Sequence, residues 1–65
     1  MQIAPEVREV EDLARIAKVP LSKALRRAGV ASTTYWRWVN AGSEPSTKTI
    51  RKIKTAIHEL GVEAA

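Results

Sequence analysis

The stretch that decides the fold runs from residue 21 to residue 42 and has the sequence LSKALRRAGVASTTYWRWVNAG. Its first eight residues repeat apolar positions at i, i+3, i+4 and i+7, the spacing of one helical face, through Leu21, Ala24, Leu25 and Ala28. Gly29 is then expected to end this helix, because glycine readily adopts the left-handed backbone conformation found at helix ends. A second helix is predicted from Ala31 or Ser32 to Gly42.

The two predicted helices can be tested against each other by their helical phase. If Gly29 lies in the turn, the buried positions should be Ala24, Leu25, Ala28, Val30, Tyr35 and Trp38. The outward positions should then be Ser32, Thr33, Trp36, Arg37 and Asn40, none of which is aliphatic. Two short helices joined by a tight turn containing glycine are typical of a helix-turn-helix, whose second helix enters the major groove of DNA.

Working outward, each flank predicts one more helix. Apolar residues recur at steps of three and four from Pro5 to about Lys18, through Val7, Val10, Leu13, Ala14 and Ala17. Pro20 interrupts the pattern because it pushes the preceding residue out of the helical region. Ser46 is a good N-cap for a last helix that should end at Gly61.

The expected architecture is therefore an all-α, compact domain of four helices, or five. Residues 1–65 should form one domain with the helix-turn-helix at about 20–41, and residues 1–4 and 62–65 should be frayed.

Charge is distributed unevenly along the chain. The formal net charge is +4, yet residues 1–12 carry one arginine and four acids. Residues 13–43 carry six basic residues and no acid. A long basic segment without carboxylates favours binding to a polyanionic partner. A basic face that contacts only solvent remains the alternative explanation.

Composition argues against several function classes. A chain of 65 residues rarely encloses the deep pocket that enzymes require, so we expect no enzyme activity and no small-molecule ligand. With no cysteine and one histidine, no metal site or cofactor is expected. No apolar run is long enough to span a bilayer, and the acidic start lacks a secretory pattern, which predicts a cytoplasmic protein without a membrane partner.

Residues 19–61 resemble the lambda-repressor-like helix-turn-helix family, which includes phage repressors, Cro-type proteins and small bacterial regulators of the XRE type. The resemblance rests on RRAGV at the turn, on the Arg37 and Trp38 pair followed by Val39 and Asn40, and on Pro45 and Ser46 before TIRKIKTAI. It implies that the loop after the third helix binds the phosphate backbone of DNA through Asn40, Ser43, Thr47 and Lys48.

Base contacts are predicted for Ser32, Thr33, Trp36 and Arg37. Hydroxyl groups in the first turn of such a helix can pair with base edges, and an arginine one turn later can bond both acceptors of guanine. Ser32 could instead cap the helix, Arg37 could bind a phosphate, and Trp36 could cover a protein interface. Lys23 and Thr34 are further candidate phosphate contacts, whereas Arg26, Arg27, Arg51, Lys52, Lys54 and His58 are expected to be solvated surface residues.

The sequence thus predicts a sequence-specific binder of double-stranded DNA, a repressor or Cro-like transcriptional regulator of phage or bacterial type. A homodimer is expected to form weakly, or only on DNA, unless the chain is the DNA-binding part of a longer regulator. Two alternatives remain open: a protein interaction module, such as an adaptor or antirepressor that uses the Trp36 face, and an architectural or recombination accessory protein.

Overall fold

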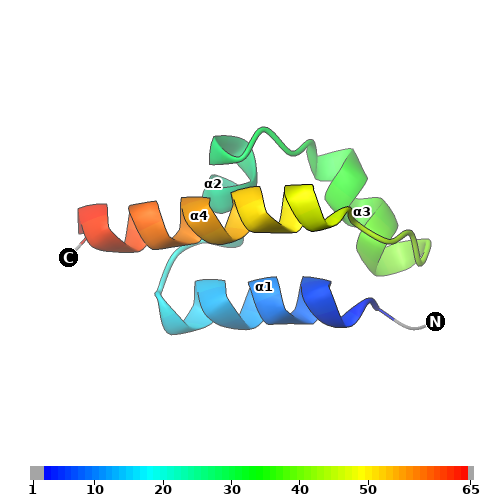
Figure 1. The fold of residues 1–65 in the computed structure, drawn as a ribbon, viewed down its shortest axis with the longest axis horizontal. Helices are drawn as coiled ribbons and strands as arrows, with labels where there is room; N and C mark the ends of the chain where they lie inside the picture. Colours follow the sequence, from blue (N-terminus) through cyan, green and yellow to red (C-terminus); the bar gives the residue numbers. More distant parts are fainter. Residues whose placement is uncertain (1–2, 65) are drawn as a thin grey trace.

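The computed structural model describes residues 3–64 and contains four helices (Figure 1). These are α1 (Pro5–Ile16), α2 (Leu21–Arg27), α3 (Ser32–Asn40) and α4 (Thr47–Ala64). No strand occurs within the described residues. The prediction of an all-α chain with four helices is confirmed.

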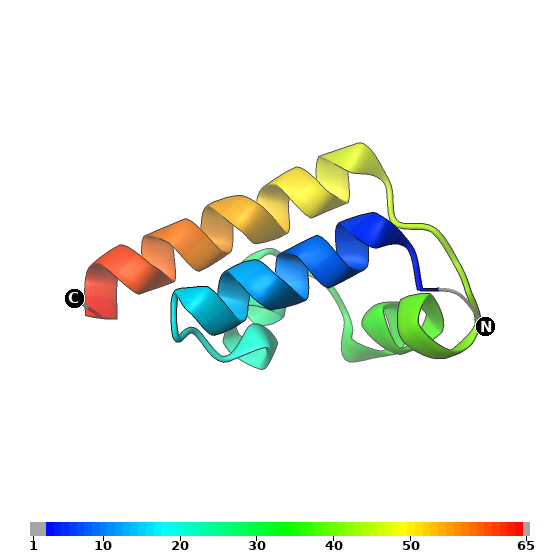
Figure 2. The same ribbon diagram turned by 90° about the horizontal axis from the view of Figure 1, so that it is seen from below.

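The helices are arranged around a parallel pair. α1 and α4 lie side by side and run in the same direction, with both of their first turns at the end of the molecule that carries α3 (Figures 1 and 2). α1, α2 and α4 pack pairwise against one another, whereas the backbone of α3 approaches the other helices at few points. α3 is therefore an outer element attached to a three-helix body.

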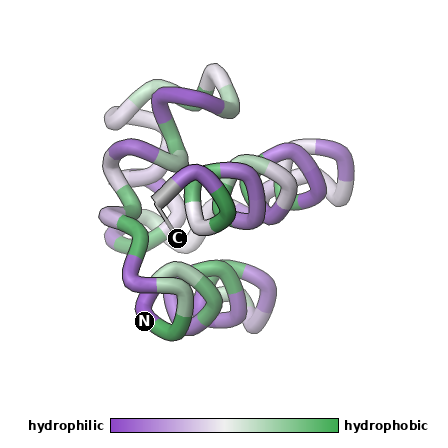
Figure 3. The backbone as a smooth tube through the Cα atoms, turned by 90° about the vertical axis from the view of Figure 1, so that its left-hand side faces the viewer, coloured by the Kyte–Doolittle hydropathy of each residue, from purple (hydrophilic) through white to green (hydrophobic). Residues whose placement is uncertain are grey.

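The core is a single apolar cluster between these helices. Apolar and polar residues alternate around each helix (Figure 3), so each one turns an apolar face inward. The buried residues are Val7, Val10, Ala14, Val19, Ala24, Leu25, Trp38, Ile50, Ile53, Ala56 and Ile57. Leu13, predicted on the buried face of α1, is 37% exposed because it lies at the margin of that face, and Ala17 is half-buried.

The first two helices end in the same hydrogen-bonded motif. After α1, the N–H of Val19 donates to the carbonyl of Ala14 at 2.9 Å, and Lys18 between them has a φ of +57°. After α2, the N–H of Val30 donates to the carbonyl of Leu25 at 2.8 Å, and Gly29 has a φ of +76°. The stop predicted at Gly29 is confirmed, and Lys18 adopts a left-handed conformation that normally favours glycine.

The prediction that the last helix ends at Gly61 is wrong. α4 continues to Ala64, with Gly61 in helical conformation and packed toward Ala17 and Val19 of the α1–α2 connection. A Cβ atom at Gly61 would make only ordinary van der Waals contacts with these residues, so this position does not require glycine and the helix continues through it. Of the ends predicted to fray, residues 1–2 and 65 lie outside the described residues, while residues 62–64 continue α4.

Candidate nucleic-acid interface

The outer side of α3 gathers the four residues predicted to contact bases. Ser32, Thr33, Trp36 and Arg37 are all exposed. Their spacing places them on neighbouring turns of one side of the helix. The two tryptophans face opposite ways, because Trp36 is 60% exposed and Trp38 only 5%. The predicted helical phase of α3 is confirmed.

Two aromatic residues hold α3 against the body. Trp38 enters the core, and the ring of Tyr35 meets it edge to face, with centroids 6.1 Å apart and planes at 73°. The Tyr35 hydroxyl donates a hydrogen bond to a carboxylate oxygen of Glu11 on α1. Partial burial, and then this carboxylate, raise the pKa of Tyr35 well above its ordinary value of 10.0.

At the end of α3, the side chain of the predicted phosphate contact Asn40 forms a hydrogen bond with the backbone of its own helix. The Asn40 side-chain amide donates to the carbonyl of Trp36 at 3.1 Å, and the N–H of Ser43 donates to the carbonyl of Arg37 at 3.3 Å. Gly42 between them has a φ of +72°. These bonds order the loop and leave the Ser43 side chain exposed.

Two more predicted phosphate contacts, Thr47 and Lys48, lie directly after the loop, in the first turn of α4. Ser46 caps this helix, since its hydroxyl accepts the N–H of Thr49 at 3.1 Å, as the sequence predicted. Thr47 and Lys48 follow at once and are exposed. Asn40, Ser43, Thr47 and Lys48 therefore lie along one continuous segment, from the end of α3 to the first turn of α4, and all four are exposed.

The remaining two predicted phosphate contacts differ from each other. Lys23 is exposed on α2, whereas Thr34 is half-buried at the start of α3 and offers less of its hydroxyl to a partner. Arg26, expected to be a solvated surface residue, is exposed on α2 and lines a groove of about 270 Å³ together with Ser22 and Ser32.

Ion pairs separate the basic residues into two groups. Arg15 pairs with Asp12 and Lys54 with Glu9, while Arg27 lies 2.7 Å from Glu63 and 3.6 Å from Glu59. The Glu63 carboxylate raises the pKa of Arg27, and Arg27 lowers that of Glu63. Within residues 3–64, the basic side chains outside ion-pair distance of any carboxylate are Arg8, Lys18, Lys23, Arg26, Arg37, Lys48, Arg51 and Lys52.

The acidic residues are concentrated on α1. This helix carries Glu6, Glu9, Glu11 and Asp12, and α2 and α3 carry no acid at all. α1 packs against both α4 and α2, and its Glu11 reaches Tyr35 of α3, so the acidic helix borders the other three (Figures 1 and 2). The acids of the sequence are thus concentrated on one helix, whereas α2 and α3 carry only basic charges.

The described residues supply little for other kinds of site. Across residues 3–64, no three His, Asp or Glu side chains come together in a group that could hold a metal ion. None of the helices in that range combines the length and the apolar character needed to cross a membrane. His58 is exposed on α4.

Comparisons with known proteins returned no match: no family model, no curated protein and no solved structure is significantly similar to this chain.

Proposed function

We propose that this protein binds double-stranded DNA in a sequence-specific manner, with α2 and α3 as a helix-turn-helix and α3 in the major groove. The observation that carries the proposal is that Ser32, Thr33, Trp36 and Arg37 share the exposed side of α3 while Trp38 occupies the opposite side. The outer side of α3 is thereby free for a partner, and its chemistry suits base edges.

Each of these side chains has a distinct role in the proposal. Arg37 donates two hydrogen bonds to guanine, because its planar guanidinium matches the two acceptors in the major groove. Ser32 and Thr33 lie in the first turn of α3, the part of such a helix that contacts bases most closely, and use their hydroxyls. Trp36 packs on a thymine methyl group or a sugar.

Contacts to the phosphate backbone position the protein without selecting a sequence. Asn40, Ser43, Thr47 and Lys48 make them from the end of α3 to the start of α4, Lys23 adds a contact from α2, and Thr34 a weaker one. This arrangement also supports membership in the lambda-repressor-like family, which we propose on the sequence motifs above.

The biological role that fits is transcriptional regulation by occupancy of an operator, as in a repressor or a Cro-like protein. One module of this kind buries about 600 to 1,000 Å² on DNA, which is modest for tight binding. Two copies on half-sites about one helical turn apart would supply the missing affinity, as a homodimer that is weak or forms only on DNA.

One observation favours a second candidate function. The indole of Trp36 is 60% exposed, and a large exposed aromatic side chain also suits a partner protein. A protein interaction module would use the same side of α3 and would be indifferent to DNA.

Two measurements test the proposal. Binding of a labelled duplex of mixed sequence at several salt concentrations should show log K falling steeply with log salt, by about 0.9 for each phosphate neutralised. Selection from a pool of random duplexes should then enrich one motif. A slope near zero together with an unenriched pool would refute DNA binding and leave the protein interaction module.

A further inference from the structure

The basic residues of α4 differ in what surrounds them. Lys54 forms an ion pair with Glu9 of α1. Arg51 and Lys52 have no carboxylate at ion-pair distance within residues 3–64, although all three belong to one basic run in the sequence. The fold therefore separates one neutralised lysine from two uncompensated cations.

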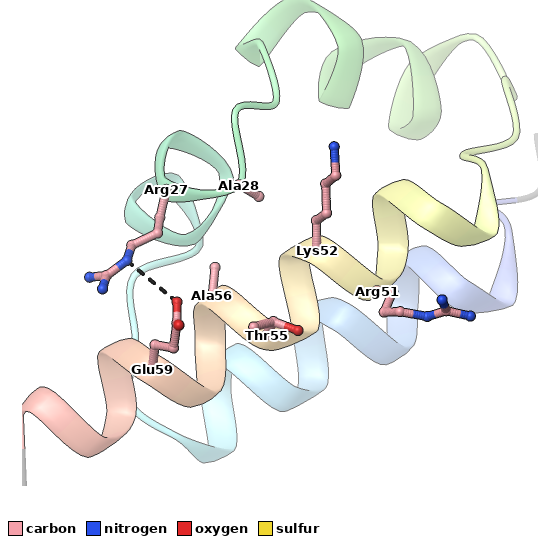
Figure 4. Close-up of a pocket in the computed structure, with 7 residues that line it drawn as sticks. All are labelled: Arg27, Ala28, Arg51, Lys52, Thr55, Ala56 and Glu59. Carbon is pink, nitrogen blue, oxygen red and sulfur yellow. Dashed lines mark ion pairs between the residues drawn. The ribbon is translucent and has the colours of Figure 1, made fainter.

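The uncompensated cations line a cleft to which the paired Arg27 and Glu59 also contribute. This cleft lies between α4 and the end of α2, has a volume of about 420 Å³, and includes the small side chains of Ala28 and Ala56. Figure 4 shows Lys52 extending from α4 into the space between α4 and the α2–α3 segment, whereas Arg51, which also lines the cleft, extends from α4 in a different direction. The cleft opens next to the α2–α3 unit, so its basic rim adjoins the proposed DNA-binding surface.

Lys48 connects this rim to the loop after α3. Lys48 and Lys52 are four residues apart on one helix, so they lie on the same side, about 6 Å apart along the axis. No acid occurs from Thr47 to His58, and the first one, Glu59, is held near Arg27. The basic strip thus begins at the start of α4 and ends where Glu59 and Glu63 meet Arg27.

We propose that Arg51 and Lys52 extend the phosphate-binding surface from Lys48 onto the second turn of α4, so that the DNA backbone lies along the rim of this cleft. The inference rests on the proposed function, and it assigns a binding role to two residues that the sequence alone left as a solvated helix face. Lys54, only two residues further on, takes no part because Glu9 neutralises it and α1 lies on its side.

Lys54 supplies a matched control for the test. The double variant Arg51→Gln with Lys52→Gln should make the slope of log K against log salt shallower by about 1.8, which is 0.9 for each lost phosphate contact. Lys54→Gln should leave that slope at the parent value. The probe is a labelled duplex of mixed sequence, and thermal melts of all variants confirm that each is folded.

The outcomes separate this inference from the function on which it rests. If the parent protein binds the duplex with a steep salt dependence and the double variant keeps the parent slope, the rim is a solvated face and only this inference fails. A change of slope for Lys54→Gln that is half of the change for the double variant would refute it too, because both changes would then simply follow the number of positive charges removed. A parent protein that does not bind DNA refutes the proposed function itself.

Discussion

The three-helix body and α3 are built in different ways. α1, α2, α4 and the α1–α2 connection supply ten of the eleven buried core residues, and α3 supplies Trp38 alone. The body is thus fixed by a distributed apolar interface, whereas α3 is held by the buried Trp38, by the half-buried Tyr35 and Val39, and by the hydrogen bond from Tyr35 to Glu11. An element held by so few side chains keeps most of its surface free for a partner.

Replacing Trp38 should have the largest effect. Trp38→Ala removes the one buried side chain of α3 and should destabilise the protein by about 3 to 5 kcal/mol. Trp36→Ala removes the other tryptophan side chain of α3, which is exposed, and should change stability by less than about 0.5 kcal/mol. Thermal melts followed by circular dichroism measure both. The reverse order would mean that α3 is rotated.

Replacing Arg37 should affect binding and leave the fold unchanged. Arg37→Ala should cost about 1 to 3 kcal/mol on the sequence enriched by selection, much less on a scrambled duplex, with an unchanged melting temperature. Arg37→Lys keeps the charge and loses the planar geometry, so it should also lose discrimination between the two duplexes. Titrations of the three proteins on both duplexes decide this. If both variants lose affinity equally on the two duplexes, Arg37 binds a phosphate.

The contact between α3 and α1 should weaken at high pH. Because the pKa of Tyr35 is raised in the folded protein, the folded state keeps its phenolic proton at pH values where the unfolded state has lost it. Stability relative to Tyr35→Phe should therefore fall as the pH rises above 10.0, the ordinary value. At neutral pH the Phe variant should be less stable by about 1 kcal/mol.

Chemical denaturation of both proteins at a series of pH values measures this difference. Tyr35 is the only tyrosine of the chain, so the phenolate absorbance reports its titration directly. Parallel stability curves for the two proteins above that pH would show that the hydroxyl does not join α3 to α1.

Two glycines should respond in opposite directions, with the smallest effects. A Cβ atom at Gly61 would lie 3.6 Å from that of Ala17, an ordinary contact, so Gly61→Ala should stabilise the body by up to about 1 kcal/mol. Gly29→Ala should destabilise the link to α3 by about 1 kcal/mol, because φ there is +76°. Melting temperatures of both variants test this. Destabilisation by Gly61→Ala would show that α4 needs the glycine beside the α1–α2 connection.

Local sequence patterns were sufficient for the helices and for the phase of α3. Spacing of apolar residues identified all four segments, and it placed Trp36 outside and Trp38 inside, because these features depend on neighbours within a turn or two. The cap at Ser46 and the stop at Gly29 are local in the same sense. The predicted base-contact residues share a side of α3 for this reason.

Features that depend on distant residues could not be predicted in this way. Gly61 has the pattern of a helix end, yet α4 continues past it alongside the α1–α2 connection, which local spacing could not show. Likewise, Arg51, Lys52 and Lys54 look equivalent along the chain until α1 brings Glu9 to one of them. Glu9 and Lys54 are 45 positions apart in the sequence, so the local spacing of residues does not reveal that they form an ion pair.

Under the proposed function, the carboxylates concentrated on α1 affect how fast, and in which orientation, the protein encounters DNA. The molecule measures 36 × 20 × 17 Å, so its opposite sides are further apart than the screening length of about 8 Å at physiological ionic strength. A polyanion near α1 is repelled, and one near the opposite side is attracted, so the protein experiences a torque during diffusion. Neutralising the α1 carboxylates would raise the net positive charge, so association with a polyanion would become faster and less dependent on the orientation of the protein.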